Sequence, residues 1–216
     1  MRKRNQRKEL RRFKSTMLLD KRPIDNFQTG SPQHEAVLTN GTWIAHRRSK
    51  SFRQIYTQLQ RNILALDLRS SEHWQVLSYN KEGHYAPHYD YMNPKTNNAI
   101  VNLAGNRIAT VLVILQTAKL GGTTVFPKLG VNIRPKIGDV IVWINILPNS
   151  LADHDTLHAA CPILDGVKIG ATLWVHEYHQ EQRLRCSIDS EYFNTERFFK
   201  PFLSAADYQL TRQYFD

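Results

Sequence analysis

Residues 84–90 read HYAPHYD and place two histidines, two tyrosines and an aspartate within seven positions. His88 and Asp90 are two residues apart, so both side chains project from one face if they lie on a strand or just after it. Such a pair supplies two of the three ligands of a 2-His-1-carboxylate site, which holds Fe(II) and leaves coordination positions open. Because His-x-Asp is common by chance, a metal site also requires a third ligand.

The third ligand should be a histidine on a later strand that folding brings close to the pair. The candidates are His154, His158, His176 and His179. His154 and His158 are four residues apart, the spacing of a zinc pair on a helix, but the Cys-Pro and the strand-like residues that follow disfavour a helix there. The residues alone leave the choice open, and any one of these side chains could be a structural polar residue.

Lys168 stands ten residues after His158, at the head of an apolar segment. An oxygenase that chelates a 2-oxo acid through open metal positions needs a fixed cation for the far carboxylate of that acid. A lysine in a pocket supplies this cation as a point charge. The alternative is a solvated lysine at the end of a strand.

The elements that must position these residues change character along the chain. Apolar residues recur at three- and four-residue steps in SFRQIYTQLQRNILALDL and predict an amphipathic helix over about 50–66, capped by Ser49 or Ser51. After it come β-branched and aromatic segments bounded by Gly, Pro and Asn, which predict strands at 73–79, 107–116, 123–126, 139–145 and 169–177. We therefore expect a mainly β fold, a sandwich or barrel with flanking helices.

Composition excludes several classes of protein. The 216 residues carry a formal net charge of +10, and the first twelve hold seven Lys/Arg against one Glu. Without aromatic residues between them, these charges predict a solvated tail rather than a nucleic-acid arm. The longest apolar run, 108–115, is too short to span a membrane, and the basic start has no apolar signal-peptide region after it.

Four blocks of the sequence resemble the catalytic domain of the prolyl 4-hydroxylases, especially the collagen type. They are HYAPHYD, GNRIAT at 105–110, GGTTVFP at 121–127, and LHAACP with the Lys168 and ATLWVHE residues that follow it to 177. The resemblance implies a double-stranded β-helix (jelly roll). It divides the chain into a basic N-terminal tail or partial lead-in over 1–39, a catalytic domain over 40–186 and a C-terminal extension over 187–216, where we expect a short packed helix.

The resemblance also assigns roles, residue by residue. It implies that His88, Asp90 and His158 bind iron and that Lys168 pairs with the distal carboxylate of 2-oxoglutarate, which the Tyr79 hydroxyl helps to hold. It further implies a peptide groove beside the iron, lined by Tyr85, Arg107, Trp174 and His176. It also implies a disulfide between Cys161 and Cys186. Tyr79 and Trp174 could instead be core aromatics, and the cysteines could be reduced.

The resemblance implies a peptidyl-proline 4-hydroxylase that couples oxidative decarboxylation of 2-oxoglutarate to hydroxylation of proline in collagen-like or other proline-rich peptides. Its cofactors would be Fe(II), 2-oxoglutarate, O2 and L-ascorbate. We expect a catalytic domain alone, a possible partner subunit and no nucleic-acid partner. Its origin would be the endoplasmic-reticulum lumen, with the true N-terminus outside this chain, or else the cytoplasm. Alternatives are a 2-oxoglutarate dioxygenase for another residue or protein and a catalytically silent peptide-binding module.

One departure from the family bears on the substrate. Ile169 and Leu173 stand where relatives often carry Trp and Lys. We expect these two changes to alter the wall of the pocket.

Overall fold

Two antiparallel sheets of five strands each build the domain, which we describe from a computed structural model for residues 37–93, 99–180 and 183–184. The long sheet has the order β2 (Asn40–Ile44), β3 (Trp74–Tyr79), β12 (Lys168–His176), β5 (Arg107–Gln116) and β9 (Val140–Ile144). The short sheet has the order β1 (Val37–Leu38), β4 (His84–His88), β10 (His158–Ala160), β7 (Thr124–Phe126) and β8 (Val131–Ile133).

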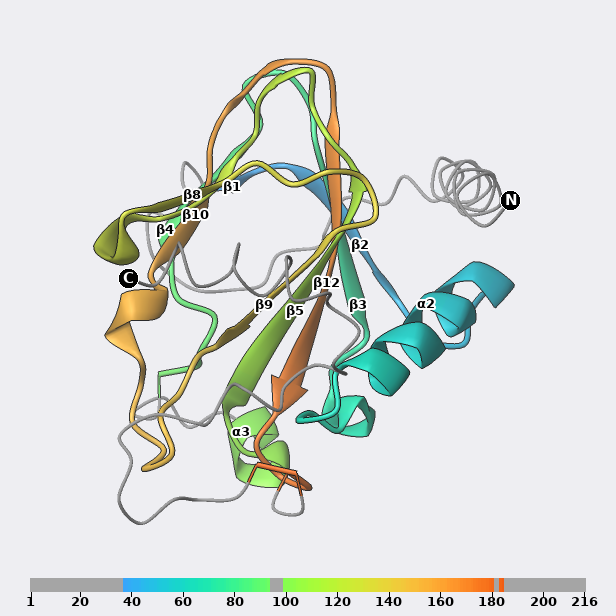
Figure 1. The fold of residues 1–216 in the computed structure, drawn as a ribbon, viewed down its shortest axis with the longest axis vertical. Helices are drawn as coiled ribbons and strands as arrows, with labels where there is room; N and C mark the ends of the chain where they lie inside the picture. Colours follow the sequence, from blue (N-terminus) through green and yellow to red (C-terminus); the bar gives the residue numbers. More distant parts are fainter. Residues whose placement is uncertain (1–36, 94–98, 181–182, 185–216) are drawn as a thin grey trace, which may run out of the picture.

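A third, two-stranded sheet joins β6 (Leu120–Gly121) to β11 (Ile163–Asp165) at one end of the domain. The short sheet lies across the long one, and Figure 1 shows the chain passing between them through loops at both ends. The strands of both sheets pair out of sequence order, as in a jelly roll, which confirms the mainly β double-stranded β-helix predicted from the sequence.

The five predicted strands correspond to the long sheet's β3, β5, β9 and β12 and the short sheet's β7. The prediction for β5 matches at both ends, because its apolar residues are buried on both faces of the sheet and form one unbroken run. The strands that sequence reasoning missed are short or polar. Their existence depends on partners far away in the chain, as for β4, which pairs with both β1 and β10.

The two faces of β12 serve two different purposes. Alternate residues point the same way on a strand. Ile169, Ala171, Leu173 and Val175 accordingly pack in the main hydrophobic core, whereas Lys168, Gly170, Thr172 and Trp174 line a cavity between the sheets. The expectation that Ile169 and Leu173 form part of the pocket wall is therefore wrong. The two-residue period turns both side chains toward the opposite face.

Helix α2 (Lys50–Asn62) covers that opposite face of the long sheet (Figure 1). Ser49 caps it, accepting a hydrogen bond from the backbone N–H of Phe52 at 3.2 Å. The helix ends four residues before the predicted 66, although Ile63 and Leu66 continue its buried stripe. Gln60 explains the early end: its side chain accepts from the Leu68 N–H and donates to the Leu66 carbonyl, which satisfies backbone groups that have left the helix.

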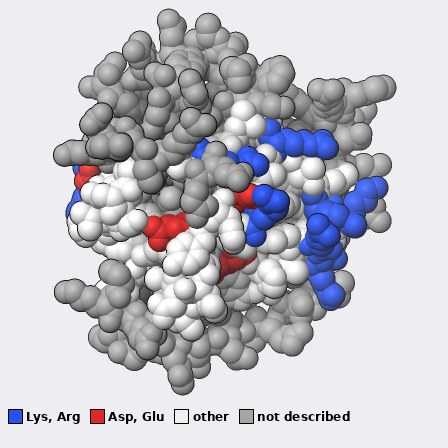
Figure 2. Space-filling view, turned by 90° about the horizontal axis from the view of Figure 1, so that it is seen from below, with Lys and Arg blue, Asp and Glu red and all other residues white. Residues whose placement is uncertain are grey.

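The solvent side of α2 is basic. The helix contains Lys50, Arg53 and Arg61 and no acidic residue. Figure 2 shows Lys and Arg side chains gathered on the side of the molecule where this helix lies. None of the helices in the described part of the chain is long and apolar enough to span a membrane.

Four shorter helical elements complete the described fold. They are α3 (Ala99–Ala104), which precedes β5, and the 3-10 turns η2 (Leu68–Ser70) and η4 (His154–Thr156), which precede β3 and β10; a further turn, η3 (Pro127–Leu129), links β7 to β8. Residues 1–36 of the predicted tail over 1–39, the predicted helix after Ser187 and the rest of the C-terminal extension lie outside the described residues. The domain boundaries at 40 and 186 stay predictions.

Candidate functional site

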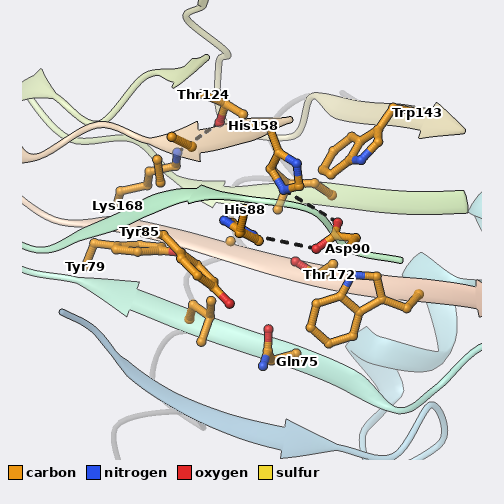
Figure 3. Close-up of a pocket in the computed structure, with 16 residues that line it drawn as sticks. Gln75, Tyr79, Tyr85, His88, Asp90, Thr124, Trp143, His158, Lys168 and Thr172 are labelled. Carbon is orange, nitrogen blue, oxygen red and sulfur yellow. Dashed lines mark hydrogen bonds and ion pairs between the residues drawn. The ribbon is translucent and has the colours of Figure 1, made fainter. Parts of the chain in front are cut away.

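His88, Asp90 and His158 meet inside the cavity between the sheets (Figure 3). The antiparallel pairing of β4 and β10 sets His158 opposite His88. Asp90 follows β4 by two residues, and its carboxylate oxygens lie 3.6 Å from Nε2 of each histidine. The potential ligand atoms lie within 4.8 Å of one another, and among the described residues this is the one cluster of its kind. The donor set fits a 2-His-1-carboxylate metal site.

The hydrogen bonds of the two histidines leave the right nitrogen free. Nδ1–H of His88 donates to the Ala86 carbonyl at 2.8 Å, and Nδ1–H of His158 donates to the Thr156 carbonyl at 2.9 Å. Each ring is thereby held in the tautomer whose Nε2 lone pair faces Asp90. Burial lowers the pKa of His88 to about 4, aided by the neighbouring His158. His88 is therefore neutral near pH 7, the form that binds metal.

The other three histidine candidates have different surroundings. His154 lies in η4, where its Nδ1 is 3.2 Å from the Tyr91 hydroxyl. Nδ1–H of His176 donates to the Gly105 carbonyl at 2.7 Å, and its Nε2 lies 3.1 Å from Glu72 Oε1. His179 lies beyond the end of β12. Of the four, only His158 joins the cluster.

Lys168 is a buried cation in the same cavity. It begins β12 and is 3% exposed, and its Nζ donates to Thr124 Oγ1 at 3.1 Å. Burial lowers its pKa to about 8. No carboxylate of the described residues forms an ion pair with it. Because an unpaired buried charge is costly, the site favours an anionic ligand beside Lys168.

Two tyrosines line the cavity together with Lys168 and the histidines. Tyr79 on β3 stands opposite Lys168 in register, is 6% exposed, and has a pKa raised by burial. Tyr85 stacks on the His88 ring, with 3.6 Å between the centroids and 12° between the planes. Both line the cavity (Figure 3). Each is therefore placed to contact whatever occupies it.

Arg107, Trp174 and His176 form a second group, joined by Glu72. The Arg107 guanidinium lies 3.7 Å from the centroid of Trp174, and Nε and Nη2 donate to Glu72 at 2.6 and 3.0 Å. Nη1 of the same arginine donates to the Asp90 carbonyl at 3.3 Å. Tyr85 and Trp174 line the cavity, whereas Arg107 and His176 lie outside its lining. The predicted peptide-contact roles stay predictions.

Sequence reasoning missed Glu72. Burial is the largest single effect on the pKa of Glu72 and by itself would raise it. The hydrogen bonds with His176 and Arg107 together outweigh burial and hold the pKa below its ordinary value. A charged Glu72 is thus the common partner of the Arg107 guanidinium and the His176 ring. The only signal in the sequence is an acidic residue directly before a predicted strand.

An aromatic cluster adjoins the metal-ligand candidates. Tyr89 and Tyr91 flank Asp90 in the sequence, with ring centroids 4.8 Å apart. The Tyr89 hydroxyl donates to the His154 carbonyl at 3.2 Å, and Lys128 Nζ lies 5.8 Å from the Tyr89 ring. The tyrosines are half-buried and His154 and Lys128 are exposed. Sequence reasoning did not assign Tyr89 or Tyr91 a role.

Of the two cysteines in the predicted disulfide, the structure describes only Cys161. Cys161 follows β10, is partly buried, and its N–H donates to the Thr123 carbonyl at 2.9 Å. Cys186 lies outside the described residues. The pairing therefore stays a prediction.

Comparison with known proteins agrees with this geometry. The 2OG-Fe(II) oxygenase superfamily model matches residues 74–176, which contain all three metal-ligand candidates and Lys168. The chain is 36% identical over 152 residues to prolyl 4-hydroxylase subunit alpha-1 of Gallus gallus, covering 70% of this chain and 29% of the relative. It is 33% identical over 175 residues to subunit alpha-2 of Caenorhabditis elegans, covering 80% and 32%. The chain thus spans about a third or less of these relatives.

A solved structure extends the comparison to three dimensions. The viral collagen prolyl hydroxylase of Paramecium Bursaria Chlorella virus-1, in its 2OG complex, aligns with a TM-score of 0.54 and 26% identity. The alignment covers 65% of this chain and 80% of the viral one. Together with the clustered histidines, carboxylate and buried lysine, these likenesses establish that residues 74–176 form a 2OG-Fe(II) oxygenase domain of the kind found in prolyl 4-hydroxylase alpha subunits.

Proposed function

We propose that this domain is a peptidyl-proline 4-hydroxylase, which couples oxidative decarboxylation of 2-oxoglutarate to hydroxylation of proline in collagen-like or other proline-rich peptides. The observation that carries the proposal is the content of one cavity. It has a buried cation without a described carboxylate partner, Lys168, and the cluster of a half-buried His88 with the buried Asp90 and His158. A dicarboxylate that chelates a metal at one end and needs a cation at the other fits this arrangement.

In this proposal, the Nε2 atoms of both histidines and the Asp90 carboxylate hold Fe(II). The bound iron would supply the O2 chemistry that amino-acid side chains lack. Lys168 pairs with the distal carboxylate of 2-oxoglutarate, and Thr124, which already accepts a hydrogen bond from Nζ, fixes the direction of the ammonium group. Tyr79 closes the cavity beside Lys168, excludes water there and offers its hydroxyl to the same carboxylate.

The peptide side of the site is aromatic. Proline-rich chains adopt the extended polyproline II conformation and bind to aromatic surfaces. Tyr85 and Trp174 line the cavity. Tyr89 and Tyr91, whose rings contact each other, are the sequence neighbours of Asp90, which also lines it. We propose that Tyr85 and Trp174, with Arg107 and His176 behind Trp174, position the target proline. Tyr89 and Tyr91 would contact the residues that flank it.

The decisive experiment is mass spectrometry of proline-rich peptides after incubation with the protein, Fe(II), 2-oxoglutarate and ascorbate. We expect a gain of one oxygen atom on proline, lost under anaerobic conditions. His158→Ala and Asp90→Ala should abolish this product and succinate formation, because each removes a ligand, while circular dichroism remains native. Turnover by either variant at the wild-type rate would refute the assignment of ligands.

The same experiment separates the alternatives. Oxygen on another residue, located by fragmentation, would indicate a 2-oxoglutarate dioxygenase of different specificity. Peptide binding without succinate formation would indicate a silent peptide-binding module. A nucleic-acid binder would instead lose affinity steeply with salt.

Collagen-type specificity carries further expectations. Ascorbate would sustain turnover, a partner subunit would join the alpha-type chain, and the protein would function in the endoplasmic-reticulum lumen. These features are proposed from the likeness to prolyl 4-hydroxylase alpha subunits. Product formation with and without ascorbate tests the first of them.

A further inference from the structure

One oxygen of the Asp90 carboxylate is held by a chain of two buried side chains. Oδ2 accepts a hydrogen bond from Thr110 Oγ1 at 2.7 Å, and Thr110 Oγ1 in turn accepts one from Asn145 Nδ2 at 2.9 Å. Asp90 is 4% exposed, and Thr110 and Asn145 are both fully buried at 0%. Neither Thr110 nor Asn145 is among the potential ligands of the cluster.

The long sheet holds both residues rigidly. Thr110 lies on β5, in register with Trp174 on β12 and Trp143 on β9. Asn145 directly follows β9, where its N–H donates to the Ile108 carbonyl at 2.8 Å and its carbonyl accepts from the Asp153 N–H at 2.9 Å. The chain of hydrogen bonds thus starts from fixed backbone and ends on the carboxylate.

The direction of the chain follows from the number of hydrogens. A threonine hydroxyl has one hydrogen, and an ionised carboxylate only accepts. Thr110 must therefore give its hydrogen to Asp90, and its other neighbour must be a donor. The amide nitrogen of Asn145 meets that requirement. As a consequence, Asn145 locks the rotation of the Thr110 hydroxyl toward Asp90.

The Asn145 side chain also carries an energetic cost, a buried oxygen left unpaired by the described residues, which supports the same conclusion. Its Oδ1 is buried and has no hydrogen-bond partner among the described residues. An unpaired buried oxygen is unfavourable, and an aliphatic side chain of similar size would avoid it. The one described hydrogen bond of the Asn145 side chain is that to Thr110. This bond is the benefit that sets asparagine apart from leucine at this position.

We infer that Thr110 and Asn145 are positioning residues of the metal centre, an inference that rests on the proposed iron site. They hold Oδ2 and so fix the plane of the Asp90 carboxylate. The two oxygens lie equally far from the histidines, Oδ1 3.6 Å from His88 Nε2 and Oδ2 3.6 Å from His158 Nε2, but only Oδ2 accepts a hydrogen bond from a described residue. The arrangement presents Oδ1 to the metal and limits Asp90 to one oxygen ligand, which keeps coordination positions open for 2-oxoglutarate and O2.

The test is the affinity for Mn(II), used as an air-stable probe for Fe(II), measured by calorimetry without cosubstrate. Thr110→Val keeps the shape and removes the hydroxyl, and we expect it to weaken Mn(II) binding by roughly 10- to 100-fold. Thr110→Ser keeps the hydroxyl and should restore most of the affinity. Thr39→Val removes a hydroxyl that donates to the Ser78 carbonyl away from the cavity, and should leave the affinity unchanged.

A double variant separates the chain of hydrogen bonds from mere packing. Asn145→Leu should also weaken Mn(II) binding, because the Thr110 hydroxyl loses the hydrogen bond that fixes its rotation toward Asp90. If Asn145 acts only through Thr110, Thr110→Val/Asn145→Leu should bind Mn(II) as Thr110→Val does. Two independent packing defects would instead add.

Mn(II) affinity within about twofold of wild type in natively folded Thr110→Val would overturn the inference, and so would additive effects in the double variant. If Thr110→Val does not fold, Asn145→Leu decides: unchanged Mn(II) affinity there rejects the chain. His158→Ala tests the underlying site separately. Mn(II) affinity that survives His158→Ala would refute the proposed iron site rather than the roles of Thr110 and Asn145.

Discussion

Lys168 and Tyr79 stand opposite each other on β12 and β3, with Lys168 Nζ 5.8 Å from the centroid of the Tyr79 ring. The ring covers one side of the ammonium group and Thr124 accepts a hydrogen bond from it. This pocket desolvates the cation without neutralising it. It therefore prepares a charge whose natural complement is a carboxylate.

Removing that charge should weaken cosubstrate binding selectively. In Lys168→Ala we expect the KM for 2-oxoglutarate to rise at least ~30-fold, because a buried charge pair contributes about 2–5 kcal/mol. Mn(II) affinity should change much less. Lys119→Ala is the matched control, since Lys119 is exposed and pairs with Asp165 at 3.4 Å. An unchanged KM in Lys168→Ala would mean that Lys168 does not bind the cosubstrate.

The affinity for 2-oxoglutarate should depend on pH through the same residue. Burial lowers the pKa of Lys168 to about 8, and only the protonated amine attracts a carboxylate. Below pH 8 the affinity should be flat, and above it the affinity should fall by up to about tenfold per pH unit. Calorimetric titrations at pH values on both sides of the pKa check this. Lys168→Ala should show weak binding with no such inflection, and an inflection that persists there would assign it to another group.

Glu72 should contribute to both stability and substrate binding. Glu72→Gln leaves the half-buried Arg107 without its carboxylate, so we expect the free energy of unfolding to fall by about 2 kcal/mol near pH 7, the size of a hydrogen bond to a charged group. The pKa of Glu72 lies below its ordinary 4.5. Its stabilisation is therefore complete above that value and disappears as the pH falls through the lowered pKa. Urea unfolding of both proteins across this pH range measures the difference, which should shrink in acid.

Kinetics of Glu72→Gln then distinguish positioning from stability alone. Arg107 stacks on Trp174 at the cavity wall, so its release should raise the peptide KM by roughly tenfold, the effect of one charge-assisted hydrogen bond. The KM for 2-oxoglutarate should not change. Equal effects on both KM values would mean that Glu72 supports only the fold.

Tyr89 and Tyr91 should contribute to peptide binding. Replacing either with alanine removes an aromatic surface worth about 1 kcal/mol, so we expect the peptide KM to rise about fivefold. The KM for 2-oxoglutarate and kcat should stay close to wild type. Tyr178→Ala, which removes an exposed tyrosine beyond β12, serves as the control. If a short Pro-containing peptide shows no change in either variant, the cluster does not contact substrate.

The Cys161–Cys186 bridge is tested by counting thiols on unreduced, denatured protein. We expect no free thiol, and reduction should lower the free energy of unfolding by very roughly 3 kcal/mol, the chain-entropy value for a loop of this length. Two free thiols would contradict the disulfide and favour a cytoplasmic origin. Cys161→Ser serves as the control, since it should leave one thiol.

Local pattern in the sequence determined the elements whose stability is local or whose burial is continuous. The sequence predicts both ends of β5 correctly, because a continuous apolar, β-branched run is typical of a strand that is buried on both faces of a sheet. Helix α2 was predicted from its spacing, but its end was not. The buried stripe continues through Ile63 and Leu66 after the Gln60 side chain has replaced the helical hydrogen bonds.

The site divides in the same way. The pair His88 and Asp90 was visible in the sequence because two-residue spacing brings both to one face of a strand. Spacing alone leaves four candidates for the third ligand, and only the family resemblance indicates His158. The tertiary structure supplies the reason, because the register of β4 with β10 brings His158 opposite His88.

Glu72, Thr110 and Asn145 were invisible for the same physical reason. Each acts through a hydrogen bond to a residue at least 20 positions away in the chain. A sequence records which polar groups exist, whereas only the folded sheets determine which of them are buried together. Burial is also what lowers the pKa of His88 to about 4 and so keeps this imidazole in the neutral form that binds metal near pH 7.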